Sequence, residues 1–165
     1  MRRRLMAGLM ASVLIVMAAI PAGASHQISF RGYVTDVAEA ADAMDGVRAV
    51  ATAHQGNGHT VARLNVRDID QSLAGNAFGA HVHVGPCVAG DGAAALGHYN
   101  NGGDPSHRTE VWLDFTVTGQ GTGHATAVVP FLIPAGGAAS VVIHEMATAP
   151  SGAAGARLAC LPLGF

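Results

Sequence analysis

The sequence contains no lysine, so arginine supplies all nine of its basic residues. Three of these arginines lie within the first four residues, which leaves six against eleven acidic residues, a net charge of about −5 with histidine neutral. Nucleic acids and anionic membrane surfaces favour proteins with an excess of positive charge. The charge balance therefore argues against both as partners.

The chain also lacks an N-terminal apolar run long enough for a stable membrane span. Residues 5–20 are apolar, follow three arginines and precede the small residues Ala22, Gly23 and Ala24. This pattern is typical of a secretory signal peptide over residues 1–24. We expect export to the periplasm, the cell envelope or the medium, with no membrane span left after cleavage; an uncleaved N-terminal anchor is the alternative. No cysteine follows the run, which argues against a lipoprotein.

Aromatic residues make up only 5% of the chain, and no repeat or linker divides it. Residues 25–165, about 141 in number, are enough for one domain with a core and too few for two. We therefore expect a single domain beyond the leader. Nothing in the sequence sets its oligomeric state.

The chain has only two cysteines, Cys87 and Cys160. In an exported protein they are expected to pair, although two buried free thiols are the alternative. The disulfide would close a loop of about 74 residues. In the chain-entropy model this stabilises the fold by roughly 4 kcal/mol.

Short alternating or β-branched runs recur between turns rich in glycine, asparagine and aspartate. They predict eight strands, over residues 27–35, 47–53, 60–67, 78–84, 110–118, 123–129, 139–144 and 156–161. Eight short strands separated by such turns predict an all-β fold, an antiparallel Greek-key barrel or sandwich.

The connections between these strands are of two kinds. Residues 55–58 and 119–121 predict hairpin turns, and residues 36–45 predict either one helical turn or a loop. Residues 85–109, 130–138 and 145–155 carry no strand signal. The first of these is long for a compact domain, and long ordered loops are usually functional.

Four histidines stand in contexts that suggest a metal site. His81 and His83 lie two residues apart in a predicted strand, so both rings project to one side, opposite the apolar Ala80 and Val82. If the apolar side faces the core, the two rings lie on the outer wall, under the loop 85–109. His98 and His144 come from distant segments, and an all-imidazole set suits a redox metal such as copper.

Five motifs follow one another along the chain: Gly79-Ala80-His81-Val82-His83, Cys87, Gly97-His98-Tyr99-Asn100, Val141-Val142-Ile143-His144-Glu145 and Gly155-Ala156-Arg157-Leu158-Ala159-Cys160. In this order they resemble the motifs of the Cu/Zn superoxide dismutase family. The resemblance implies a Greek-key barrel and the conversion of superoxide to dioxygen and hydrogen peroxide. Beyond residues 79–160 it rests on strand count alone.

The resemblance also implies roles for individual residues. His81, His83 and His144 match the permanent copper ligands, and His98 matches the ligand that bridges to zinc in zinc-containing members. Cys87 and Cys160 match the intrasubunit disulfide.

Two residues are predicted to be catalytic. Arg157 matches the guanidinium beside copper, and its fixed positive charge would attract the superoxide anion. His98 could leave reduced copper, take up a proton and pass it to the peroxide product.

The zinc ligands are where the chain departs from the family pattern. After His98 the segment offers only His107 with nearby carboxylates, so at most a weak zinc site made of His98, His107 and one carboxylate is expected, and bound zinc is doubtful. A carboxylate, first Glu110 and second Asp114, is predicted to hold His98 instead. The chain resembles copper-only members in this respect. The connection between His144 and Arg157 is short and poor in charge, which leaves Arg157 as the main group that steers the substrate.

The leading hypothesis is therefore an exported copper-dependent superoxide dismutase. One alternative is a dismutase-like copper carrier or store with little turnover. The other is a structural β-sandwich whose histidines no longer bind metal.

Overall fold

A computed structural model describes residues 26–38 and 42–163 of the chain. Residues 1–25, which include the predicted signal peptide, lie outside the described residues. The described residues form antiparallel strands joined by loops, with no α-helix and with two short 3₁₀ helices, η1 (Gln71–Leu73) and η2 (Gly92–Ala95). Within this part of the chain, no helix has the length and apolar character that a membrane crossing requires.

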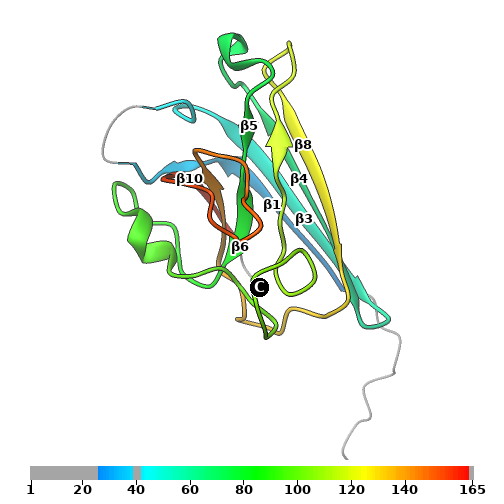
Figure 1. Ribbon diagram of the computed structural model, residues 1–165. Coiled ribbons are helices and arrows are strands. Elements are labelled where there is room, and N and C mark those ends of the chain that lie inside the picture. Colours follow the sequence, from blue (N-terminus) through cyan, green and yellow to red (C-terminus); the bar gives the residue numbers. More distant parts are fainter. Residues whose placement is uncertain (1–25, 39–41, 164–165) are drawn as a thin grey trace, which may run out of the picture.

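Two four-stranded antiparallel sheets make up a β-sandwich (Figure 1). The first sheet contains, in spatial order, β1 (His26–Tyr33), β3 (Arg48–Gly56), β4 (His59–Arg67) and β8 (Gly123–Val129). The second contains β2 (Thr35–Asp36), β10 (Arg157–Pro162), β9 (Ser140–His144) and β6 (Ala80–His83). A separate pair joins β5 (Ala77–Phe78) to β7 (Phe115–Thr116). The predicted all-β antiparallel class is confirmed.

The two sheets differ in how they are covered. In β3 and β4 nearly every second residue is buried, since successive side chains alternate between the core and the outer face. In β6 and β9 every residue is buried. The second face of β6 and β9 is therefore covered as well, and the loops 84–109 and 145–156 supply the groups that contact it, as described below.

Three predicted strands are interrupted. The strand predicted over 27–35 breaks at Val34, where the chain passes from the first sheet to the second. The strand predicted over 78–84 breaks at Gly79, whose backbone N–H donates to the carbonyl of Met146 in the loop 145–156. A Cβ atom at Gly79 would lie 2.7 Å from that carbonyl oxygen, so the loop packs this closely only against glycine.

Of the strand predicted over residues 110–118, only β7 forms as a regular strand. Before it, Glu110 and Trp112 pair through isolated bridges with Asn100 and His81. The carboxylate of Asp114 accepts hydrogen bonds from the backbone N–H groups of Ala80 and Thr148, which belong to two other segments. The segment before β7 thus pairs partly with Asn100 and partly with β6, and it forms no continuous ladder with either.

Both predicted turns form. Asn57 and Gly58 have positive φ angles of 52° and 76°, as expected of the type I′ turn that joins β3 to β4. Residues 119–121 also turn tightly, but β7 and β8 on either side belong to different sheets. Residues 39–41 lie outside the described part of the segment 36–45, whose remaining residues contain a turn and no helical turn.

Candidate metal centre

The four predicted histidines converge on one point, which is the centre of the candidate metal site. His81 and His83 lie on β6, His144 ends β9, and His98 lies in the loop 84–109. One ring nitrogen from each lies within 4.8 Å of the others, and these four form the only such group among the described residues. His81 and His83 are fully buried and His144 is 4% exposed, whereas the side chain of His98 is 19% exposed.

Strand pairing explains the convergence of the first three rings. β6 and β9 are antiparallel neighbours, with Ala80 opposite Ile143 and His81 opposite Val142. His98 reaches the same place because it forms an isolated bridge with His83. The predicted parity holds: Ala80 and Val82 join the main hydrophobic core, and the histidines face away from it.

Three of the rings are held through Nδ1, so that Nε2 faces the centre. His83 Nδ1 lies 3.2 Å from the carbonyl oxygen of Leu96, and His144 Nδ1 lies 3.4 Å from that of Gly155. His98 Nδ1 lies 2.8 Å from Glu110 Oε2. Carbonyl and carboxylate oxygens only accept hydrogen bonds, so each Nδ1 carries the proton and each Nε2 keeps its lone pair.

This arrangement leaves two lone pairs facing each other, because His83 Nε2 and His144 Nε2 lie 3.3 Å apart. Two acceptors at this distance repel unless a cation lies between or beside them. His81 Nδ1, the fourth nitrogen, is buried and has no hydrogen-bond partner within the described residues. Four lone pairs directed at one point suit a metal ion, and an all-imidazole set suits copper among other late transition metals.

Glu110 is the buried carboxylate behind His98. Besides His98 it accepts hydrogen bonds from Trp112 Nε1 at 2.8 Å and Asn100 Nδ2 at 3.1 Å. Burial raises the pKa of this carboxyl, but the hydrogen bonds from Trp112, His98 and Asn100 together outweigh burial and lower it overall. Glu110 therefore stays ionised and fixes the orientation of the His98 ring.

Asp114 and His107 do not lie beside His98. Asp114, the second candidate for holding His98, lies behind His81, and Thr148 stands between them. His107 is outside the group of converging histidines, and its ring lies edge-on to Trp112 with 6.4 Å between the ring centroids. The described residues therefore do not bring His98, His107 and a carboxylate into one metal-binding group.

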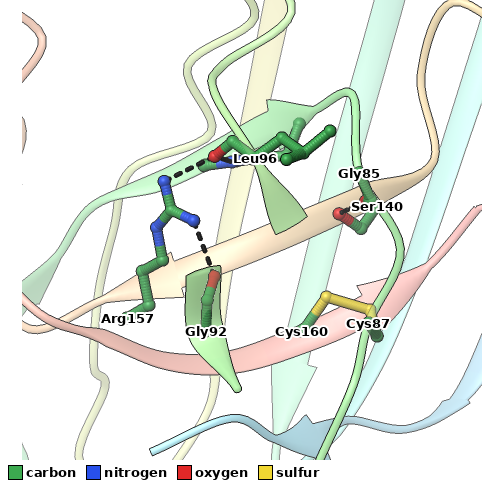
Figure 2. Close-up of a disulfide and its surroundings, with 8 residues drawn as sticks. Gly85, Cys87, Gly92, Leu96, Ser140, Arg157 and Cys160 are labelled. Atoms are coloured by element: carbon green, nitrogen blue, oxygen red, sulfur yellow. Dashed lines mark hydrogen bonds between the residues drawn. A yellow bond between two sulfur atoms is a disulfide. The ribbon is translucent and has the colours of Figure 1, made fainter. Parts of the chain in front are cut away.

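Arg157 and the disulfide anchor the loop beside the centre (Figure 2). The guanidinium of Arg157 donates from Nη1 to the carbonyl of Gly92 at 2.6 Å and from Nη2 to that of Leu96 at 2.5 Å. Cys87 and Cys160 are disulfide-bonded, as predicted, and tie the same loop to β10. Because Leu96 also holds His83, the guanidinium, the disulfide and a histidine ring are connected through one short segment.

A search of solved structures found a protein of similar fold. It is the crystal structure of a double mutant, in which histidine replaces a tyrosine and a proline, of an SOD-like protein from Bacillus subtilis. The two chains are 18% identical, with a TM-score of 0.55, and the match covers 88% of this chain and all of the other. The chain has an SOD-like fold. No protein-family model and no curated protein sequence matches it.

Within this SOD-like fold, burial keeps three of the histidines neutral. Burial lowers the pKa from 6.5 to about 2 for His81, about 3 for His83 and about 4 for His144, and repulsion from His98 adds to the shift in all three. Neutral imidazoles are the form that binds metal, so the site is ready for a cation at neutral pH.

These pKa shifts predict how the stability of the metal-free protein depends on pH. Below pH 6.5 the three rings take up protons in the unfolded chain but not in the folded one, so acidification favours unfolding. Between pH 6 and 5 we expect the free energy of unfolding to fall by up to about 4 kcal/mol per pH unit, about 1.4 for each ring.

Urea titrations of chelator-treated protein at several pH values would measure this slope. His144→Gln should reduce it by about one third, whereas substitution of the exposed His124 should leave it unchanged. A flat profile between pH 6.5 and 5 would contradict the neutral-ring interpretation.

Proposed function

We propose that this protein is an exported, copper-dependent superoxide dismutase that works without zinc. The observation that carries the proposal is the convergence of four imidazole nitrogens in an SOD-like fold, beside a fixed guanidinium. Copper would supply one-electron chemistry, oxidising one superoxide to dioxygen and reducing a second, with two protons, to hydrogen peroxide. The export proposal draws support from the disulfide, which is typical of proteins outside the reducing cytosol.

Arg157 is the group that attracts the substrate. Its two hydrogen bonds to loop carbonyls fix the guanidinium at the edge of an open cleft, which is lined by Gly92, Leu96 and Gly97 among others. Its charge acts on the centre, because it contributes to lowering the pKa of His83 and His144. A fixed positive charge beside a cleft raises the local concentration of a small anion.

His98 is the proton donor. It is the most exposed of the four rings, so it can exchange protons with water more readily than the buried three. Its Nδ1–H stays with Glu110, which leaves Nε2 as the atom that takes up a proton and delivers it to the product. Glu110 keeps the ring directed at the centre while this happens.

Arg157→Ala tests the proposal against copper storage. We expect the copper-loaded variant to retain one copper per chain while kcat/KM for superoxide falls roughly 10-fold or more, since electrostatic steering raises association rates by about 10 to 10³. Stopped-flow decay of superoxide at low and high salt, with copper and zinc measured by elemental analysis, would give both quantities.

Arg63→Ala is the matched control, because Arg63 is exposed on β4 in the other sheet. It should change neither copper content nor rate. If superoxide decays equally fast with wild type and with Arg157→Ala, and in both cases about as fast as in buffer alone, the result would favour a copper store over a catalyst.

A further inference from the structure

Thr148 occupies an unexpected position between a histidine of the centre and a carboxylate. Its Oγ1 lies 2.6 Å from His81 Nε2 and 2.7 Å from Asp114 Oδ1, while its backbone N–H donates to Asp114 Oδ2 at 2.7 Å. The direct separation of His81 Nε2 and Asp114 Oδ1 is 3.9 Å, which is too long for a hydrogen bond. The hydroxyl is therefore the link between the ring and the carboxylate.

The chemistry of these three groups fixes the direction of both hydrogen bonds. A carboxylate only accepts, so the hydroxyl proton of Thr148 points to Asp114. The hydroxyl oxygen must then accept from His81, which places the ring proton on Nε2. His81 Nδ1 is left without a proton, buried and without a partner within the described residues, as a metal ligand should be.

His81 thus differs from the other three histidines of the centre. They face it through Nε2 and are held through Nδ1, whereas His81 faces it through Nδ1 and is held through Nε2. The backbone of β6 alone does not decide this, because a neutral imidazole can carry its proton on either nitrogen.

The same contacts attach the loop 145–156 to the centre. Thr148 lies in this loop, and the loop closes on itself through Met146 N–H to the Ala154 carbonyl and Ala149 N–H to the Ala153 carbonyl. Asp114 accepts from both the backbone and the hydroxyl of Thr148. Movement of the loop would therefore displace the group that holds His81.

We propose that Thr148 is a positioning residue, whose hydroxyl selects Nδ1 of His81 as the atom offered to the metal and couples this ligand to the loop 145–156. The proposal rests on the proposed copper centre but not on its catalytic rate. Removal of the hydroxyl releases the Nε2 proton from its acceptor, so the ring can carry its proton on Nδ1 and lose its lone pair at the centre.

Thr148→Val tests the proposal, because valine keeps the shape and removes the hydroxyl. In the metal-free, ¹⁵N-labelled protein at pH 7, we expect the two ring nitrogens of His81 to show the Nε2–H tautomer in wild type and a mixture or the Nδ1–H tautomer in the variant. Cu(II) affinity, measured by chelator competition, should fall roughly 10- to 100-fold, the usual cost of losing a partner that orients a ligand. The Cu(II) EPR spectrum should change, and amide exchange in the loop 145–156 should accelerate.

Two further variants separate positioning from general damage. Thr148→Ser keeps a hydroxyl and should restore the tautomer, affinity and spectrum, while Thr116→Val, at an exposed position of β7, should leave all of them unchanged. A folded Thr148→Val with the wild-type tautomer and wild-type copper affinity would overturn the proposal. Wild-type protein that binds copper but does not remove superoxide would refute the proposed function alone, whereas wild-type protein that binds no copper would refute both.

Discussion

His144→Ala is expected to remove most of the copper-dependent stabilisation and to abolish superoxide removal. The variant loses one of the four converging nitrogens, and ligand loss should cost more copper affinity than the roughly 10- to 100-fold that an outer partner contributes. At free copper 1,000 times the wild-type Kd, bound metal stabilises the wild type by about 4 kcal/mol. At the same concentration, copper should stabilise the variant far less. Superoxide should decay in the presence of the variant about as fast as in buffer alone.

The metal-free form of this variant gives a second and more specific result. In the wild type, the Nε2 lone pairs of His83 and His144 face each other at 3.3 Å. Truncation of His144 removes this repulsion, which offsets part of the packing lost with the ring. Thermal unfolding with and without copper should therefore show a large loss of stability only in the loaded state.

His124→Ala is the matched control for His144→Ala. His124 is also a strand histidine, but it is exposed on β8 in the other sheet. It should bind copper, resist unfolding and remove superoxide like the wild type. Full activity of His144→Ala, with copper still bound, would exclude the proposed centre.

The second large effect is expected from Cys87→Ser combined with Cys160→Ser. The disulfide spans 73 residues in sequence, and loss of a cross-link of this size destabilises a fold by about 4 kcal/mol in the chain-entropy model. For a domain of this length, that corresponds to a fall in Tm of roughly 10–20 °C. Chemical denaturation of oxidised wild type, reduced wild type and the double variant would measure the change.

The disulfide should also affect the metal centre. Cys87 and the carbonyls of Gly92 and Leu96 belong to one loop, and those carbonyls hold Arg157 and His83. Without the bond to Cys160, this loop is free to move away from β10. We therefore expect weaker copper binding in the double variant even at temperatures where it is folded. If the double variant lost less than about 1 kcal/mol in free energy of unfolding and bound copper as tightly as the wild type, this account of the loop would be contradicted.

Much of the fold could be read from local patterns. The alternation of small apolar and polar residues placed Ala80 and Val82 on the core side and the two histidines of β6 on the other, as the structure shows. The turn at residues 55–58 was predictable because Asn57 and Gly58 tolerate positive φ angles. The irregular run before β7 was not predictable, since Asp114 makes its hydrogen bonds with two segments distant in the sequence.

The sequence identified the histidines of the candidate site, but it identified fewer of the groups that surround them. Glu110 was singled out for His98 as a carboxylate that could accept the ring N–H, and the structure places it within hydrogen-bond distance. Asp114, the second choice for His98, lies behind His81 instead. Thr148 was missed, because nothing in the local pattern of the loop 145–156 distinguishes it from an ordinary loop threonine.

Four imidazoles, two thiols and one guanidinium can be identified without any coordinates, and the period of two in a strand places two of the imidazoles on one side. Which nitrogen of each ring faces the centre follows only from the folded arrangement. That choice depends on acceptors such as the Leu96 carbonyl and the Thr148 hydroxyl, which lie 13 and 67 residues from the rings they hold. Hydrogen bonds between such distant groups exist only once the sheets have paired and the loops have closed over β6.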